Sequence, residues 1–392
     1  MDLKTIRSIS EAKMNSRKIN SIAFYDVNLL NHKNYIGDII CEFVSNGYSV
    51  TLFYDEFSQE GFDFFKCLDV KIIRNGLVSK RTIEKKLLES RASTLIVNAQ
   101  RLGDTAFVTV AKEMGIKTGM IQHGMYVPFM KRERFFLVKK AIKTLRYFIY
   151  SFIISKALDR KFNEVLKCFL NTFVKGGIYK DSIPFHEEVN TDYVLVYGPY
   201  WKDYHRDIFG YRSAQMFDLG YHELSKIDET KNKKMEPMTV CYIAQTLVED
   251  GRLARQLQES FLDALEKLKG VKVVIKLHPR SNRAMYEGRG FRLEEKRGVP
   301  HCPLYIGHYS SLLALAGSVS TMVLFEFPGH EIPEYFSRNA AVVNAVEQLS
   351  PTIEEILEKG MPSAGGSFDD IFSLGYSPER AFSIIQKFQS ET

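Results

Sequence analysis

The sequence predicts an α/β protein built from two Rossmann-like domains, and three observations lead to this. The chain has 392 residues, more than one hydrophobic core usually organises. Short apolar runs rich in Val, Ile and Tyr alternate with helical patterns along most of its length. These runs are apolar almost throughout, which is typical of strands in a parallel sheet covered on both faces.

The expected strands lie in both halves of the chain. In the first half they are Ile19–Tyr25, Tyr48–Tyr54, Val70–Arg74, Thr94–Asn98, Lys117–Gln122 and Tyr193–Tyr197. In the second half they are Thr239–Ala244, Val271–Leu277, Leu304–Ile306, Thr321–Phe325 and Ala340–Asn344. Amphipathic helices are expected between them, for example at Thr82–Ser90, Leu253–Lys269 and Ser311–Gly317.

A polar segment without periodicity, Asp228–Pro237, separates the halves and is the expected linker. The domains are accordingly expected at 1–230 and 238–376, facing each other across an interdomain cleft. A C-terminal helix at 377–392 is expected to pack back on the first domain.

Composition excludes several classes of protein. The net charge of +6 is modest for this length, so no nucleic-acid partner is expected. The five cysteines are scattered without metal-ligand spacing, which indicates reduced, buried thiols in a cytoplasmic protein. The N-terminus has no apolar signal core. The most lipophilic stretch, Phe135–Ser155, is interrupted by Lys139, Lys140, Lys143 and Arg146. Its longest charge-free run, Tyr147–Ser155, is too short for a bilayer, which needs about 20 residues.

A basic helical insertion, Met130–Lys175, interrupts the alternation. Ten Lys or Arg lie from Lys131 to Lys161, against only Glu133 and Asp159, and aromatic residues lie between them. Such a segment fits an anionic membrane surface, which would make the protein peripheral on the inner face of the cytoplasmic membrane. The alternative is a helical hairpin packed on its own domain with a solvated basic face.

Three short motifs in the second half each follow an expected strand. Ligands of open parallel sheets bind outside the carboxyl ends of the strands, so all three motifs should face one crevice. The first motif runs from Ala244 to Gly251 and contains Gln245, Glu249 and Asp250. One of its two carboxylates could act as a general base in the crevice, although an ordinary turn has the same pattern.

The second motif is Lys276-Leu277-His278-Pro279-Arg280. Alternation along the strand directs Lys276 and His278 to one face. An imidazole at a sheet edge suits a phosphate leaving group, and the alternative is a histidine satisfied in the core.

The third motif, Gly307-His308-Tyr309-Ser310-Ser311, precedes an apolar helix. Hydroxyls and free N–H groups at a helix start can hold a phosphate. An ordinary serine N-cap has the same sequence pattern.

Taken in order, Glu249-Asp250-Gly251, His278-Pro279 and Ser310-Ser311 resemble the motifs of bacterial GT-B sialyltransferases, including lipooligosaccharide sialyltransferases and capsule polysialyltransferases. The resemblance covers about Thr239–Phe336. It implies a GT-B fold and inverting transfer of sialic acid, or a related nonulosonate, from a CMP-activated donor. The implied acceptor is a bacterial surface glycan or glycolipid, as in lipooligosaccharide, O-antigen or capsule.

By this resemblance Asp250 would deprotonate the acceptor hydroxyl, with Glu249 beside it, and His278 would contact or protonate the CMP phosphate. Ser310 and Ser311 would hold that phosphate, and neither a metal nor another cofactor is expected. The full set of expected donor-binding residues is Lys276, Pro279, Ser310, Ser311, Gly307, Glu326, Glu331, Gln245 and Gly251.

The first half contains one comparable motif, Ile121-Gln122-His123-Gly124-Met125. Its Gln-His-Gly resembles a segment of several capsule and teichoic-acid transferases, so His123 competes with Asp250 for the role of base. Tyr197–Trp201 could border the same crevice or be packing.

Three other functions stay open. A CMP-Kdo transferase would share the leaving group. A CDP-glycerol-type glycerophosphotransferase, whose nucleotide domain has a similar Lys-Leu-His-Pro strand end, would attack phosphorus. A catalytically inactive capsule-assembly subunit would keep the fold without the chemistry.

Overall fold

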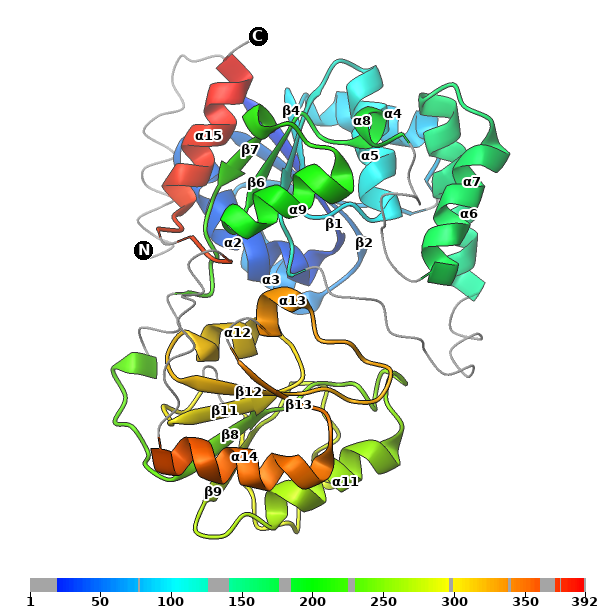
Figure 1. The fold of residues 1–392 in the computed structure, drawn as a ribbon. Helices are drawn as coiled ribbons and strands as arrows, with labels where there is room; N and C mark the ends of the chain where they lie inside the picture. The colour runs from blue at the N-terminus through cyan, green and yellow to red at the C-terminus, as the bar shows by residue number, and fades with distance from the viewer. Residues whose placement is uncertain are drawn as a thin grey trace. The chain divides into compact units, whose positions relative to one another are not determined.

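The computed structural model describes residues 20–76, 78–125, 141–175, 185–224, 230–295, 299–337, 340–359, 371–373 and 375–390. Contacts divide the chain into two compact units. The first consists of Met1–His123, Ala141–His222 and Phe372–Thr392, and the second of Gly124–Lys140 and Glu223–Ile371. Each unit contains its own sheet and is described by itself (Figure 1).

The first unit contains a seven-stranded parallel sheet in the order β3-β2-β1-β4-β5-β6-β7. Its strands are β1 (Ser21–Asn28), β2 (Ser49–Glu56), β3 (Val70–Arg74), β4 (Thr94–Val97), β5 (Lys117–Ile121), β6 (Tyr193–Val196) and β7 (Met216–Asp218). The direction of the crossovers reverses at β1, so β1 and β4 flank the topological switch point of this sheet.

Helices lie against both faces of this sheet (Figure 1). They are α2 (Leu29–Ser45), α3 (Gln59–Lys66), α4 (Lys80–Ser90), α5 (Leu102–Glu113), α6 (Ala141–Ala157), α7 (Phe162–Lys175), α8 (His186–Val189), α9 (Pro199–Phe209) and α15 (Pro378–Ser390), with a 3₁₀ turn at Ser213–Gln215. Alternation along β1 explains the two layers. Phe24 points to Phe43 of α2, whereas Tyr25 stacks on Phe107 of α5 at 4.2 Å.

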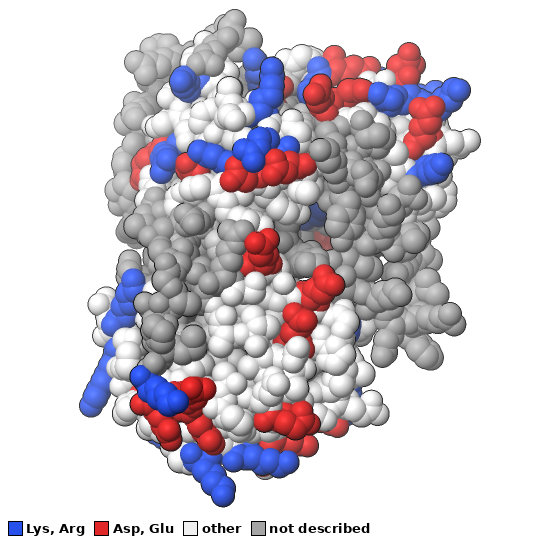
Figure 2. All heavy atoms as spheres, in the orientation of Figure 1, with Lys and Arg blue, Asp and Glu red and all other residues white. Residues whose placement is uncertain are grey.

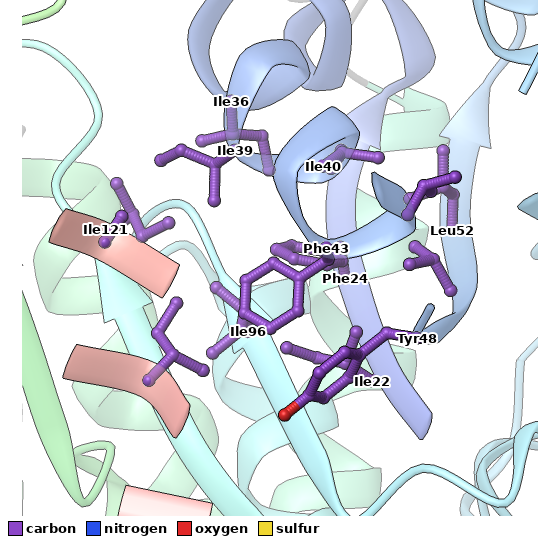
Figure 3. Close-up of a cluster of buried hydrophobic side chains, with 14 of the residues drawn as sticks. Ile22, Phe24, Ile36, Ile39, Ile40, Phe43, Tyr48, Leu52, Ile96 and Ile121 are labelled. Atoms are coloured by element: carbon purple, nitrogen blue, oxygen red, sulfur yellow. The ribbon is translucent and has the colours of Figure 1, made fainter. Parts of the chain in front are cut away.

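The core between α2 and the sheet follows directly from the sequence pattern. Ile36, Ile39, Ile40 and Phe43 recur at helical spacing, and all are buried against strand residues such as Ile22, Leu52 and Ile96 (Figure 3). The C-terminal helix α15 completes this core. Its Phe382 contacts Phe43 at 4.9 Å between ring centroids, and its Phe388 stacks on Tyr193 at 4.3 Å.

The described part of the basic insertion forms a helical hairpin, α6 and α7. Tyr150, Ile153 and Ile154 form a buried face of α6. The Tyr150 hydroxyl donates to Asp55 at 3.0 Å, which fixes α6 to the rest of the first unit. The packing of α6 agrees with the interpretation of the insertion as a helical hairpin on its own domain. Lys139 and Lys140, two of its basic residues, lie outside the described residues. A second face of α6 exposes the large apolar side chains of Leu145, Phe148 and Phe152. This face is compatible with membrane binding, so the membrane interpretation stays a prediction.

The second unit contains a six-stranded parallel sheet in the order β10-β9-β8-β11-β12-β13. Its strands are β8 (Thr239–Ile243), β9 (Lys272–Lys276), β10 (Arg292–Glu294), β11 (Leu304–Gly307), β12 (Thr321–Phe325) and β13 (Ala341–Val343). Its helices are α11 (Arg255–Glu266), α12 (Ser311–Gly317), α13 (Glu334–Ser337) and α14 (Val346–Lys359), with a 3₁₀ turn at Arg283–Met285.

These two parallel sheets with their helices confirm the predicted α/β class and the two Rossmann-like domains. Two of the three-residue edge strands, β7 and β10, were not predicted, whereas the third, β13, was. One expectation about cysteine is wrong, because Cys67 is exposed on the first unit rather than buried.

Two further properties concern the surface. Lys and Arg are interspersed with Asp and Glu on the described atoms of the face in Figure 2. Within the described residues, the helices are each too short or too polar to cross a bilayer.

Candidate functional site

The carboxyl edge of the second sheet brings the three sequence motifs together. β8 pairs with β9 on one side and with β11 on the other, so the switch point of this sheet lies beside β8. The segments that leave these three strands are bonded to one another. The Gln245 side-chain amide, after β8, donates a hydrogen bond to the carbonyl of Tyr309, after β11.

The acidic motif forms a tight turn at this edge. The Asp250 N–H donates to the Thr246 carbonyl at 2.9 Å, and Gly251 has a φ of +63°, a conformation that favours glycine. The two adjacent carboxylates have different partners. Glu249 accepts a hydrogen bond from the Asn282 N–H at 2.6 Å, which ties this turn to the one after β9.

Asp250 is bonded to the histidine-proline motif through Arg280. The two Nη atoms of Arg280 lie 2.8 and 3.3 Å from the two carboxylate oxygens, and the Thr246 hydroxyl donates to one of them at 3.0 Å. Burial alone would raise the pKa of Asp250, but the bonds from Arg280 and Thr246 leave this pKa below its ordinary value. Asp250 is therefore an ionised carboxylate, and both of its oxygens accept hydrogen bonds.

His278 lies just beyond β9, in an exposed turn that Pro279 follows. Its Nδ1 accepts a hydrogen bond from the Arg280 N–H at 3.1 Å, so the neutral ring carries its proton on Nε2. Partial burial, and then the charge of Arg280, lower the pKa of His278. A neutral imidazole with its hydrogen on Nε2 can donate a hydrogen bond to an anion beside it.

The serine motif has the arrangement of a helix cap. Ser310 is the N-cap of α12 and accepts a hydrogen bond from the Leu313 N–H at 3.0 Å, while Ser311 is the first helical residue and is half-buried. Gly307 ends β11 where a Cβ would lie 2.6 Å from a Leu313 methyl carbon, so close packing of α12 explains this glycine.

Three further residues were expected to bind the donor: Lys276, Glu326 and Glu331. Lys276 is buried within β9, and burial lowers its pKa while Glu294 and Cys241 act against that change. Alternation does not extend from Lys276 to His278, because the strand has already ended. Glu326 accepts a hydrogen bond from the Ile332 N–H at 3.3 Å and so holds its own loop, and Glu331 is exposed.

A buried histidine cluster in the second unit escaped the sequence analysis. His308 is 2% exposed, and its ring centroid lies 4.5 Å from that of Tyr309 and 5.8 Å from that of His330. Burial lowers the pKa of His308 to about 4, so the ring is neutral at pH 7. The sequence offered one indication of this cluster, because His308 lies inside the third motif.

His123, in the first unit, lies at the carboxyl end of β5, and the Tyr35 ring contacts it at 4.0 Å. Its Nδ1 is buried and has no hydrogen-bond partner among the described residues. Burial lowers the pKa of His123 to about 4, although the charge of Asp26 acts in the opposite direction.

A buried ionic cluster surrounds the switch point of the first sheet. Asp26 and Asp104 are both 0% exposed, and Arg101 bonds to them at 2.9 and 2.8 Å. Asn98 donates to Asp26 at 3.1 Å. Sequence reasoning missed this cluster, although an aspartate inside an apolar strand was its signal. Trp201, in contrast, is fully buried and serves packing.

The described residues include no group of three or more His, Cys, Asp or Glu side chains placed to hold a metal ion.

Comparisons with known proteins extend the description of the fold. No protein-family model and no curated protein sequence matches the chain. Solved structures do match it over nearly its whole length. A calicheamicin glycosyltransferase, CalG4, has a TM-score of 0.55 at 11% identity and covers 95% of this chain and 98% of its own.

Two other structures give similar values. The wall teichoic acid polymerase TagF, as a variant soaked with CDPG, has a TM-score of 0.51 at 13% identity and covers 99% of this chain and 94% of its own. The UDP-GlcNAc 2-epimerase of Methanocaldococcus jannaschii has a TM-score of 0.53 at 12% identity and covers 94% and 100%. The fold is GT-B. Because glycosyl transfer, polymerisation and epimerisation all occur among these structures, the GT-B fold alone leaves the reaction open.

Proposed function

We propose that the chain is an inverting glycosyltransferase that moves sialic acid, or a related nonulosonate, from a CMP-activated donor to a bacterial surface glycan. One observation carries the proposal. The three motifs that resemble the sialyltransferase family lie at one carboxyl edge of the second sheet, and Arg280–Asp250 and Gln245–Tyr309 bond them together. This edge is where open α/β sheets bind nucleotides.

In this proposal the donor phosphate binds beside His278 and Arg280. Arg280 has a side chain 62% exposed, so it can turn from Asp250 to a phosphate, which its planar guanidinium matches well. Asp250 then loses its strongest partner and becomes available as a base. Its release would thus depend on the presence of the donor.

The transfer step balances as a single displacement. The acceptor hydroxyl oxygen forms a bond to the anomeric carbon, and its proton passes to Asp250. The bond from that carbon to the phosphate oxygen breaks, and its electron pair leaves with CMP. The Nε2–H of His278 donates a hydrogen bond to the departing phosphate, and Ser310 and Ser311 contribute their hydroxyls.

A second candidate is glycerophosphotransfer from a CDP-activated donor. The likeness to TagF favours it, together with the Lys276–Pro279 strand end and the neutral His123. Attack would then occur at phosphorus, with His123 as the base. We rank it second, because the Glu249-Asp250-Gly251 turn has no place in that resemblance.

Release of CMP from CMP-sialic acid and from CDP-glycerol, measured side by side with a lipooligosaccharide acceptor extract, tests the proposal. Release from CMP-sialic acid alone supports it. Release from CDP-glycerol alone selects the second candidate. Release from neither contradicts both candidates and leaves a CMP-Kdo transferase or an inactive assembly subunit. We place the enzyme in the cytoplasm, at the inner face of the membrane, where such acceptors are made.

A further inference from the structure

Three buried hydrogen-bond acceptors lie close together at the switch point of the second sheet. The first is Nε2 of His308. Nδ1 of the same ring lies 2.9 Å from the Phe325 carbonyl, and a carbonyl can only accept. Nδ1 therefore carries the hydrogen, and Nε2 is an acceptor, buried and without a partner among the described residues.

The second acceptor is Oε1 of Gln245. The amide nitrogen of this side chain donates to the Tyr309 carbonyl, which fixes the orientation of the amide. Oε1 is consequently an acceptor, and it too is buried without a partner in the described part of the chain.

The third acceptor is Nδ1 of His330. A hydrogen bond to the Arg252 backbone raises the pKa of this ring, although burial has the larger effect and lowers it. A bond that favours the protonated ring is one in which the ring donates. Because Nδ1 has no partner among the described residues, the donor is Nε2, and Nδ1 is left as an acceptor.

The three acceptors are linked by direct contacts. His308 lies against both Tyr309 and His330, and Gln245 bonds to the Tyr309 backbone. The burial that lowers the pKa of His308 to about 4 keeps its Nε2 an acceptor at neutral pH. In folded proteins nearly all buried acceptors have a hydrogen-bond partner. Three neighbouring acceptors without one among the described residues therefore indicate a ligand that carries hydrogen-bond donors.

We propose that Gln245, His308 and His330 bind the base of the donor nucleotide and select cytosine over uracil. This inference rests on the proposed function, since it assumes that a nucleotide binds at this edge. Cytosine presents an amino group with two N–H donors, where uracil has a carbonyl oxygen. Two of the fixed acceptors can each accept one N–H of the amino group, and all three repel the uracil carbonyl.

The same site contains donors for the rest of the base. Arg252 forms no ion pair among the described residues, yet its charge acts on both Tyr309 and His330. The buried Tyr309 hydroxyl also has no partner in the described chain. A guanidinium and a hydroxyl can donate to the ring nitrogen and carbonyl of cytosine.

Calorimetric titration of the full chain with CMP, UMP and 2′-deoxy-CMP tests the inference. We expect CMP to bind at least ten-fold more tightly than UMP, and 2′-deoxy-CMP to bind like CMP. Equal binding of CMP and UMP would overturn the inference. A selective loss with 2′-deoxy-CMP that disappears in His330→Ala would overturn it too, because the acceptors would then bind ribose hydroxyls.

Two variants locate the effect. His330→Ala removes one of the three acceptors from a half-buried position and should lower the CMP:UMP ratio. His308→Asn keeps a donor for Phe325 while removing Nε2, and it should lower the ratio too. His301→Ala is the matched control, because His301 bonds to the Lys233 carbonyl elsewhere in the same unit. An unchanged ratio in both folded variants would contradict the inference.

The outcomes separate this inference from the proposed function. If CMP-sialic acid is turned over but CMP and UMP bind equally, only the base-recognition site is wrong. If no nucleotide binds and neither donor releases CMP, the proposed function fails first.

Discussion

Arg280 holds both carboxylate oxygens of Asp250, at 2.8 and 3.3 Å, and the backbone N–H of the same arginine binds Nδ1 of His278. One residue thereby fixes the proposed base and orients the proposed phosphate ligand. The two motifs are 28 residues apart in the chain, from Asp250 to His278.

Asp250→Asn should lower turnover by roughly two to four orders of magnitude, because the amide keeps the shape but cannot accept the proton. CMP affinity should stay nearly unchanged. Steady-state kinetics with calorimetry of CMP binding measures both. His123→Ala is the comparison from the first unit. Full activity of Asp250→Asn together with an inactive His123→Ala would reverse the two roles.

Arg280→Gln should shift the acidic limb of the kcat/KM profile to higher pH. Arg280 helps to keep the pKa of Asp250 below its ordinary value, so its loss lets that pKa rise. The base is then protonated over a wider acidic range, and activity is lost at a higher pH. Arg283→Gln is the control, since Arg283 pairs with Glu287 and Glu295 in the same loop. A shift of equal size in both variants would contradict the prediction.

His278→Ala should weaken CMP binding about ten-fold or more, because it removes the Nε2–H proposed to donate to the phosphate. Binding of CMP to the wild type should be the same in EDTA and in magnesium. Calorimetry under both conditions provides the measurement. Unchanged affinity in the variant, or a strict need for magnesium, would refute the phosphate assignment.

Acid should destabilise the fold through histidines that are buried in the neutral form. Burial lowers the pKa of His205 to about 3, while the unfolded chain binds this proton near pH 6.5. The unfolded state therefore binds more protons between these values, and stability falls as the pH drops from 6.5 towards 3. The slope is about 1.4 kcal/mol per pH unit for each such group.

Urea unfolding at pH 5, 6 and 7 tests this pH dependence in wild type and His205→Phe. Below pH 6, the free energy of unfolding should change less steeply with pH in the variant than in the wild type. The difference should be about 1.4 kcal/mol per pH unit, the contribution of one histidine. Parallel slopes for the two proteins would show that His205 is protonated in the folded state.

The exposed face of α6 should bind anionic vesicles. Leu145, Phe148 and Phe152 recur along one face, and Lys156 lies 5.6 Å from the centre of the Phe152 ring. Sedimentation with phosphatidylglycerol vesicles should decrease as salt rises, since exposed charges are screened. Phe148→Ser with Phe152→Ser should abolish it, whereas Leu88→Ser, which alters an exposed leucine of α4, should not. Binding that ignores salt would contradict the membrane interpretation.

The sequence was sufficient for strands that contain an apolar run bounded by polar residues. Thr321–Phe325 was predicted to the residue, because apolar side chains nearly fill the segment and polar residues bound it. Val70–Arg74 was also predicted to the residue, although it contains Lys71 and lies at the edge of its sheet. Met216–Asp218 and Arg292–Glu294 were missed. Neither segment is an apolar run, so the sequence contains no strand signal for them. The third three-residue edge strand, Ala341–Val343, is apolar throughout and lies within the predicted Ala340–Asn344.

The location of the candidate site could be predicted from the sequence, but the hydrogen bonds and contacts within it could not. Motifs at the ends of β8, β9 and β11 had to meet, because parallel strands end at one edge. The pairing of Arg280 with Asp250 depends on the local turns, and so does the contact of His308 with His330, 22 residues later. Turn geometry of this kind is set by tertiary packing and leaves no periodic signal in the sequence.

The position of α15 affects how this protein can be synthesised. Phe382 and Phe388 fill the core that α2 and the first strands begin, so more than 300 residues separate the partners Phe43 and Phe382. During translation the second unit can complete its sheet while the first still lacks its last helix. On the ribosome, the first unit therefore cannot complete its core until α15 has left the exit tunnel.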